Sequence, residues 1–142
     1  MRGSPVYRAV MGVCPVLLLA CSSASTQDTP AFPEAPLTTL TSDVGRLRID
    51  LRTSPNQPPV AGLDAVEIVV TDATSGAPVD GLDVTLTPWM PAMGHGASVT
   101  PLLTPMGSGH YRFTDVSLFM PGEWQLRTNF SAHSPRHRWR RT

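Results

Sequence analysis

The sequence has no cysteine after position 21, because both of its cysteines, Cys14 and Cys21, lie near the N-terminus. A domain built from the later residues therefore has no pair of thiols for a disulfide bond. It also has no thiolate to offer to a metal ion. We expect the hydrophobic core alone to hold such a domain together, and soft metal ligands to come from methionine and histidine.

Lysine is absent as well: all eleven basic residues are arginines, against eleven aspartates and glutamates. These charges are unevenly distributed. Between Cys21 and Phe130 five arginines stand against eleven carboxylates, a net charge of −6, whereas four of the last seven residues are arginines. An acidic body argues against nucleic acid as the partner of the folded part.

Helical spacing and familiar catalytic motifs are missing too. No stretch between residues 44 and 130 has the apolar period of a helix of ordinary length. The sequence contains neither a Gly-x-Ser-x-Gly turn, nor a phosphate-binding glycine loop, nor a His-Glu-x-x-His pair. Its serine, histidine and aspartate residues show no spacing typical of a catalytic triad. We therefore expect that the protein is not an enzyme.

The longest apolar run lies at the N-terminus, from Val10 to Ala20, and follows two arginines. It is too short for a stable transmembrane helix and has the length of a signal peptide core. Its end, Leu18-Leu19-Ala20-Cys21, resembles the lipobox of bacterial lipoproteins. The resemblance implies cleavage before Cys21, a diacylglyceryl thioether on its sulfur, and a fatty acid such as palmitate on its amino group. The alternative is an ordinary signal peptide that leaves Cys21 as a free thiol.

Composition divides the chain into four segments. Residues 1–20 form the predicted signal peptide, and residues 21–43 form a Ser-, Thr- and Pro-rich tether that we expect to be disordered. A flexible tether of about 20 residues would reach roughly 25 Å. Residues 44–130 carry the pattern of a folded domain. Residues 131–142 form an arginine-rich tail that is expected to be disordered, with binding to anionic lipid head groups as its alternative function.

Short apolar alternations between turn residues predict that the domain is all-β. Three clear alternations lie near residues 47–51, 66–70 and 82–86, and Pro88 is expected to end the third. Further strands are expected near residues 97–103, 110–114 and 124–129. About six or seven short strands in this length are typical of an immunoglobulin-like β-sandwich. Its predicted inward residues are Leu47, Ile49, Leu51, Val66, Ile68, Val70, Val84, Leu86, Tyr111, Phe113, Trp124 and Leu126.

Thioether and imidazole side chains gather in the segment Trp89-Met90-Pro91-Ala92-Met93-Gly94-His95-Gly96. Copper(I) is a soft ion that favours these donors, whereas magnesium and calcium prefer oxygen. Residues two apart share a face of an extended chain, so Met93 and His95 are predicted to point the same way. A complete site needs another donor, and Met120, in the turn Met120-Pro121-Gly122, is the first candidate. The predicted metal ligands are thus Met93, His95, Met120 and Met90.

These residues also have structural interpretations. Methionine commonly fills gaps in small cores, so Met90 and Met120, taken singly, fit a core role better than a ligand role. Met106 and His110 are further candidate ligands on either side of a glycine-containing turn, although His110 would then point to solvent. Zinc usually takes three or four cysteine, histidine or carboxylate ligands, and no compact spacing here supplies them.

Three motifs occur in order: Met90-Pro91-x-Met93-Gly94-His95-Gly96, Gly109-His110-Tyr111-Arg112-Phe113 and Met120-Pro121-Gly122-Glu123-Trp124-Gln125-Leu126. Together they resemble the YtkA-like domain, which is related to FixH-type proteins, over about residues 44–129. The resemblance implies a β-sandwich outside the cytoplasmic membrane, often in a lipoprotein, with a link to copper handling and cytochrome oxidase assembly. It also implies Met93 and His95 as ligands, with Met90 and Met120 as further candidates. One departure is the arginine-rich tail, which stands where a last apolar strand is expected.

Two functions fit these observations. The first is an exported, membrane-anchored lipoprotein that binds Cu(I) and buffers it or delivers it to a membrane oxidase or exporter. The second is a metal-free immunoglobulin-like module whose Met-Pro turns and Trp89 dock on a membrane complex or an efflux adaptor. Either protein would face the periplasm or the cell exterior. Ser22 after the lipidated cysteine predicts the outer membrane in a Gram-negative cell.

Overall fold

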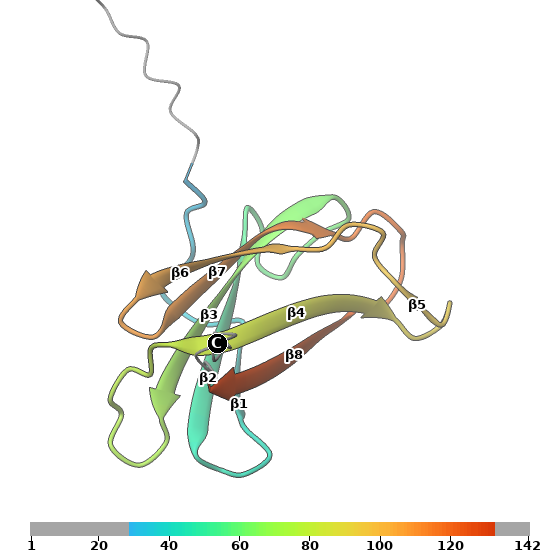
Figure 1. Cartoon of the computed structure of the whole chain (residues 1–142). Helices are drawn as coiled ribbons and strands as arrows, with labels where there is room; N and C mark the ends of the chain where they lie inside the picture. The colour runs from blue at the N-terminus through green and yellow to red at the C-terminus, as the bar shows by residue number, and fades with distance from the viewer. Residues whose placement is uncertain (1–28, 133–142) are drawn as a thin grey trace, which may run out of the picture.

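The computed structural model describes residues 29–132, which form two antiparallel β-sheets packed against each other (Figure 1). The larger sheet has the strand order β1-β2-β3-β7-β6, and the smaller one has the order β5-β4-β8. No helix in this part of the chain is long and apolar enough to cross a membrane. The predicted all-β sandwich is confirmed. Its strands are β1 Thr38–Thr41, β2 Leu47–Ser54, β3 Leu63–Asp72, β4 Leu82–Met90, β5 His95–Gly96, β6 Leu102–Gly107, β7 His110–Ser117 and β8 Gln125–Ala132.

The core lies between the two sheets and uses the residues that the alternation predicted. Successive side chains of a strand point to opposite faces, so one set is buried while its neighbours face outward. Leu47, Trp124 and Leu126 from the predicted set are only partly buried against the core. The buried core residues are Ile49, Leu51, Val66, Ile68, Val70, Val84, Leu86, Tyr111 and Phe113, to which the structure adds Ala65, Met90, Val116 and Leu118.

Tyr111 ties the two sheets together. Its ring is buried in the core, and its hydroxyl donates a hydrogen bond to the Val79 carbonyl oxygen at 3.0 Å. The same hydroxyl oxygen accepts a hydrogen bond from the Leu82 amide at 3.1 Å. Tyr111 belongs to β7 of the larger sheet, whereas Leu82 begins β4 of the smaller one. One phenol thus satisfies two backbone groups where the chain passes between the sheets.

Several strand boundaries differ from the predictions. β4 continues through Pro88 to Met90, so the expectation that Pro88 ends the strand is wrong. The Pro88 carbonyl oxygen accepts a hydrogen bond from the Ala97 amide at 3.1 Å, which places its missing N–H on the side of the short strand β5. The missing N–H thus faces the end of a two-residue edge strand, where the sheet tolerates the loss of one main-chain hydrogen bond. The strand expected at 97–103 begins only at Leu102 and reaches Gly107.

Part of the predicted tether is ordered, because β1 lies inside residues 21–43. Its four residues pair with Arg48–Leu51 of β2, and all four side chains are exposed. An edge strand of this kind is held by main-chain hydrogen bonds and buries little apolar surface, so it leaves no apolar period in the sequence. The rest of the predicted tether before residue 29, the signal peptide and the tail after residue 132 lie outside the described residues.

The residues before β1 cross the outer face of the larger sheet, and we call residues 32–37 the strap. The Arg52 guanidinium donates a hydrogen bond to the Glu34 carbonyl oxygen at 3.1 Å. The Gln57 side-chain amide donates one to the Ala35 carbonyl oxygen at 2.9 Å. Farther across the sheet, the Arg112 guanidinium lies 5.4 Å from the centre of the Phe32 ring. The strap is therefore fastened to β2, to the loop after it, and to β7.

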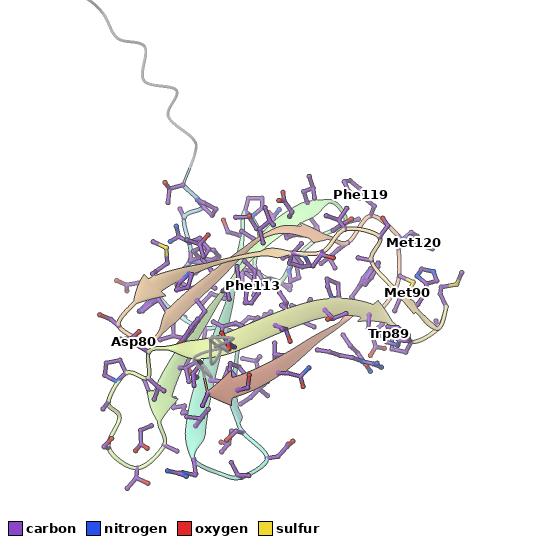
Figure 2. All side chains as sticks on the ribbon, in the orientation of Figure 1. Asp80, Trp89, Met90, Phe113, Phe119 and Met120 are labelled. Carbon is purple, nitrogen blue, oxygen red and sulfur yellow. The ribbon has the colours of Figure 1, made fainter. Side chains whose placement is uncertain are left out.

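The connections between strands gather at two ends of the sandwich. Loops 55–62, 91–101 and 118–124 lie at one end, which we call the methionine end because it carries Met90, Met93 and Met120. Loops 42–46, 73–81 and 108–109 lie at the other, which we call the aspartate end. Figure 2 shows this separation, with Met90, Met120 and Phe119 near one end and Asp80 near the other.

Candidate metal site at the methionine end

The segment with the thioether and imidazole donors folds as a tight hairpin between β4 and β5. Met90 pairs with His95 across the two strands. The Met90 carbonyl oxygen accepts hydrogen bonds from the amides of Met93 at 3.2 Å and Gly94 at 3.0 Å. Gly94 has a φ of 67°, in the left-handed region that glycine adopts without steric penalty. The sequence Met-Pro-Ala-Met-Gly-His therefore sets the turn and the register of His95.

The hairpin register places His95 on the same face of the sheet as Met90, because directly paired residues share a face. Met90 is buried at the base of this end, with a side-chain exposure of only 2%, whereas His95 is exposed. The His95 Nδ1 atom lies 2.9 Å from the Gly96 carbonyl oxygen. Since a carbonyl can only accept, Nδ1 is the donor in this contact, and the neutral ring then has its lone pair on Nε2. Histidines that bind metals usually make such a second contact.

Met93 lies in the turn itself and is 56% exposed. The left-handed Gly94 interrupts the extended conformation on which the predicted shared face of Met93 and His95 depended. The structure therefore places Met93 at the tip of the hairpin, outside the pocket that His95 lines. A role for Met93 as a ligand stays a prediction.

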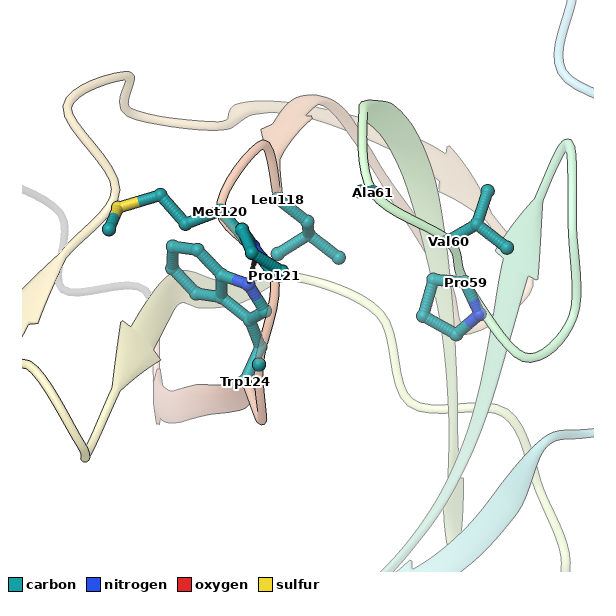
Figure 3. A pocket seen from close by; sticks show the side chains of 8 residues that line it. Pro59, Val60, Ala61, Leu118, Met120, Pro121 and Trp124 are labelled. Atoms are coloured by element: carbon teal, nitrogen blue, oxygen red, sulfur yellow. Dashed lines mark hydrogen bonds between the residues drawn. The ribbon is translucent and has the colours of Figure 1, made fainter.

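The loop 118–124 closes over Met90. A Cβ atom added at Gly122 would lie 3.4 Å from the Met90 Cε atom, so the loop backbone rests on this methyl group. The Trp124 indole N–H donates a hydrogen bond to the Met120 carbonyl oxygen at 3.0 Å, which braces the loop (Figure 3). The Leu118 amide donates another to the Gly62 carbonyl oxygen at 2.8 Å, joining this loop to loop 55–62. The loop that carries Met120 thus lies against Met90.

His95 and Met120 line one pocket of about 310 Å³, together with Phe119 and Trp124. A neighbouring hollow of about 250 Å³ shares Met120 and Trp124 and extends toward Val60 (Figure 3). Of the four predicted ligands, the structure therefore gathers His95 and Met120 at the surface and Met90 beneath them. Sequence reasoning did not assign a role here to Phe119, and the Met-Pro-Gly-Glu-Trp motif was the signal that this loop mattered.

The surface around this pocket is apolar and nearly uncharged. Glu123 is the only Asp, Glu, Lys or Arg residue within loops 55–62, 91–101 and 118–124. Phe119 is 64% exposed at the rim of the pocket. The other large apolar side chains exposed at this end are Val60, Leu63, Met93, Val99, Leu102 and Met120.

Asp64, at the start of β3, is a buried carboxyl group at the methionine end. Its Oδ2 atom has no hydrogen-bond partner among the described residues. Burial raises the pKa of this carboxyl group, because the apolar surroundings disfavour its charged form. The sequence pattern gave no sign of it, since Asp64 precedes an ordinary apolar strand.

Met106 and His110 lie at the opposite end of the sandwich from the other donors. They flank the β6–β7 hairpin, whose turn residues Ser108 and Gly109 both have positive φ values, 52° and 76°. The His110 ring points to the outer face, as predicted, where Nδ1 lies 3.4 Å from Glu67 Oε1. Among residues 29–132, no three His, Cys, Asp or Glu side chains form a group that would hold a metal ion. The candidate site consists instead of thioethers with one imidazole.

Comparison with known proteins identifies one family. Residues 41–129 match the YtkA-like family. No match was found among curated proteins or solved structures. The matched region runs from the end of β1 into β8 and contains both the 90–96 hairpin and the 118–124 loop. Because the match covers more than half of the 142 residues, the chain belongs to the YtkA-like family.

Proposed function

We propose that this protein binds Cu(I) at the methionine end and buffers the ion or passes it to a membrane oxidase or exporter. The observation that carries the proposal is the shared pocket of His95 and Met120, in which the His95 Nδ1 contact with Gly96 leaves Nε2 available. Cu(I) is a soft ion, and thioether and imidazole groups are suitable donors for it. His95 and Met120 are the primary ligands in this proposal.

Met90 and Met93 have different parts in the proposed site. Met90 is buried, and its methyl group packs against Gly122, so it supplies a thioether from the floor of the site. Met93, on the exposed hairpin tip, is a donor that a turn movement would bring to the pocket. Bound there, Cu(I) would be held in an exchangeable thioether and imidazole environment. The uncharged surface around the pocket supports direct contact with a partner during transfer.

The test is an anaerobic Cu(I) titration of the chain from Ser22 onward against a competing chelator. We expect a His95→Ala, Met120→Ala double variant to bind Cu(I) about 100-fold more weakly, by analogy with the loss of metal-site groups in other proteins. Met93→Ala measures the contribution of the hairpin tip separately. Met106→Ala, an exposed methionine at the aspartate end, is the matched control and should leave the affinity unchanged. Unchanged competition by the double variant would rule out the assigned site.

The proposed location is outside the cytoplasm, with the protein held on a membrane by lipid on Cys21. The support is the Leu-Leu-Ala-Cys sequence at the end of the apolar N-terminal run. Expression of the full chain with Cys21→Ser should shift the protein from the membrane fraction to the soluble exported fraction. Ser22→Ala should leave it in the membrane fraction. Equal membrane retention of the Cys21→Ser chain would contradict lipid anchoring.

A second candidate function, a metal-free interaction module, is favoured by the exposed apolar side chains around Phe119. In that case Phe119→Ser should abolish capture of a membrane partner. Cu(I) should then neither change the melting temperature nor affect capture. A copper-dependent rise in melting temperature that the His95→Ala, Met120→Ala variant loses would decide for the copper function.

A further inference from the structure

The smaller sheet has one long free edge, which runs along β8 (Figure 1). Among residues 29–132, β8 pairs with β4 alone. The free edges β1 and β5 are only four and two residues long, and the edge strand β6 contains Pro105. β8 has eight residues, no proline and a single charged residue, Arg127. Short length, proline and charge keep strand edges from pairing with other chains, so β8 is the least protected of these edges.

Pro88 determines which main-chain groups of β8 face the free edge. Its carbonyl oxygen accepts a hydrogen bond from Ala97, on the β5 side, so Pro88 and its partner Leu126 form a non-bonded pair. Bonded and non-bonded pairs alternate along two antiparallel strands. The N–H and C=O groups of Leu126, Thr128 and Phe130 therefore point away from β4. The side chains of the same three residues are the half-buried ones of β8.

Arg127, the charged residue of β8, is held away from this edge by its own chain. Its guanidinium lies 4.5 Å from the centre of the Trp89 ring, which belongs to β4. The same group donates a hydrogen bond to the Gln125 side-chain oxygen at 3.1 Å. The positive charge thus lies over β4 on the outer face of the sheet and does not block the edge of β8.

A second β8 fits the free edge in an antiparallel register centred on Thr128. Each Thr128 then lies opposite Thr128 of the other copy, and Leu126 lies opposite Phe130. These pairs exchange about six main-chain hydrogen bonds in total, because each residue presents both of its groups to the edge. Threonine pairs and aromatic–aliphatic pairs are favourable across strands. On the outer face Arg127 lies opposite Asn129, so the two arginines do not face each other.

We propose that two copies of this chain pair through β8 in this register and form a two-fold symmetric dimer. The two smaller sheets become one continuous sheet. Self-complementary contacts of this kind are the rule at two-fold interfaces. The proposal does not rest on copper binding, because the pocket of His95 and Met120 is lined by no residue of β8.

The cleft beside β8 supplies apolar surface for the same interface. It has a volume of about 400 Å³, and its lining joins Phe130 of β8 to Leu40, Val44 and Leu47 of the larger sheet and the loop between β1 and β2. Leu40 and Val44 are 50% and 77% exposed in the single chain. In the dimer the clefts of the two copies adjoin across the two-fold axis, so these side chains lose contact with water.

A cysteine at position 128 tests the register. The full chain with Cys14→Ser and Cys21→Ser has no other thiol. Thr128→Cys in this chain places two thiols at the two-fold axis, on residues whose Cα atoms are about 5.5 Å apart, which suits a disulfide. Ser131→Cys is the matched control on the same strand, because its two copies would lie about 20 Å apart. We expect mild oxidation to link Thr128→Cys chains at least about tenfold more than Ser131→Cys chains.

Thr128→Pro tests the main-chain pairing. Since the Thr128 N–H points to the free edge, proline there removes no hydrogen bond between β4 and β8. We expect the mass of the Cys14→Ser, Cys21→Ser chain in sedimentation equilibrium to rise from one chain toward two between about 1 and 500 µM, because the contact is small. Thr128→Pro should keep the mass of one chain, whereas Thr128→Val should still form the dimer. Thermal unfolding at the lowest concentration shows whether Thr128→Pro is folded, and if it is not, the cysteine pair decides.

Three results would overturn the proposal. The first is equal linking of the Thr128→Cys and Ser131→Cys chains. The second is a mass of one chain at every concentration, or a dimer that a folded Thr128→Pro chain still forms, which would place the interface elsewhere. The third is slow hydrogen exchange in peptides from β8 that does not depend on protein concentration, which would show that the edge is covered within one chain.

Discussion

The two ends of the sandwich are built in different ways. At the aspartate end, carboxylates close the turns: Asp72 accepts hydrogen bonds from the Thr74 and Ser75 amides at 3.0 and 2.7 Å, and Asp80 accepts one from the Gly109 amide at 2.7 Å. At the methionine end, the loops present apolar side chains to solvent and contain one carboxylate, Glu123. Carboxylates accept hydrogen bonds from the turn backbone at the aspartate end, whereas several large apolar side chains are exposed to solvent at the methionine end.

This difference separates stability from function. Side chains that bond to turns contribute to folding, because they satisfy backbone groups that would otherwise be exposed or unpaired. The exposed methionines and Phe119 at the methionine end leave apolar surface in contact with water, which does not favour folding of the isolated domain. We therefore expect substitutions at the aspartate end to change the free energy of unfolding, and those at the methionine end to change binding.

The largest loss of stability is expected for Gly109→Ala, at the aspartate end. Gly109 has a φ of 76°, and an added Cβ atom would collide with the Val70 carbonyl oxygen. Because that oxygen belongs to a central strand, we expect a loss of about 3–5 kcal/mol in the free energy of unfolding, measured by urea denaturation. Gly107→Ala is the matched control, since its φ of 80° is similar but nothing lies within 4 Å of the new atom. It should cost about 1 kcal/mol, and equal losses would refute the steric explanation.

Tyr111→Phe should cost about 2 kcal/mol in the free energy of unfolding. The substitution keeps the buried ring but leaves the Val79 carbonyl and the Leu82 amide without their partner. The measurement is thermal and urea unfolding, with Cu(I) affinity measured in parallel. If Tyr111→Phe lowered the Cu(I) affinity as much as the His95→Ala, Met120→Ala variant does, stability at the aspartate end and binding at the methionine end would not be separate properties.

Asp64 sharpens the comparison, because it is a destabilising carboxylate at the methionine end. Its pKa is raised by burial above the ordinary 3.8, so the folded state retains a proton that the unfolded state releases. The protonated Asp64 is tolerated in the folded state, so the folded state is at its most stable, with respect to this group, at low pH. That stability is lost as the pH rises from about 3.8 through the raised pKa. Asp64→Asn should remove that decline and raise stability at pH 7 by about 1 kcal/mol.

Asp72 is the control for Asp64, with the opposite sign. Hydrogen bonds from the Ser75 backbone and hydroxyl lower the pKa of Asp72, so its stabilising contribution is present at neutral pH and lost as the pH falls through and below 3.8. Urea unfolding of both Asp→Asn variants from pH 3 to pH 8 measures the two slopes. Parallel slopes would contradict the assignment of Asp64 as a buried acid.

The smallest effect on stability is expected for Met120→Leu. Met120 is partly exposed at the pocket rim, and leucine has a similar volume, so the free energy of unfolding should change by less than about 0.5 kcal/mol. Leucine has no sulfur, and Cu(I) affinity should fall about tenfold, one ligand's share of the loss proposed above. If Met120→Leu lowered the free energy of unfolding and left the Cu(I) affinity unchanged, Met120 would have a core role instead of a ligand role.

The sequence predicted the sandwich core well because alternation in β2, β3, β4 and β7 directly reports which side chains face inward. β1 and β5 were missed because they are held by main-chain pairing at sheet edges. β4 continues through Pro88 because the missing N–H of this proline faces the short strand β5. Which strand lies on that side is decided only when the sheet assembles.

The candidate donors were also predictable, but their arrangement was not. Residue type and spacing identified Met90, Met93, His95 and Met120. Met90 is buried because a loop about 30 residues away in sequence places Gly122 against it. Met93 lies outside the pocket because the hairpin register places it at the turn. Contacts between loops of distant sequence position are set by the strand order, which no local pattern contains.

The strap changes how closely the domain would be confined if Cys21 carries lipid. Because Phe32 and Glu34 are held on the larger sheet, about ten residues would separate the lipid from the domain. Such a span has a root-mean-square reach of roughly 17 Å, against roughly 25 Å for twenty residues. The volume available to the domain would be about threefold smaller, and a partner in the same membrane would meet it at about threefold higher effective concentration.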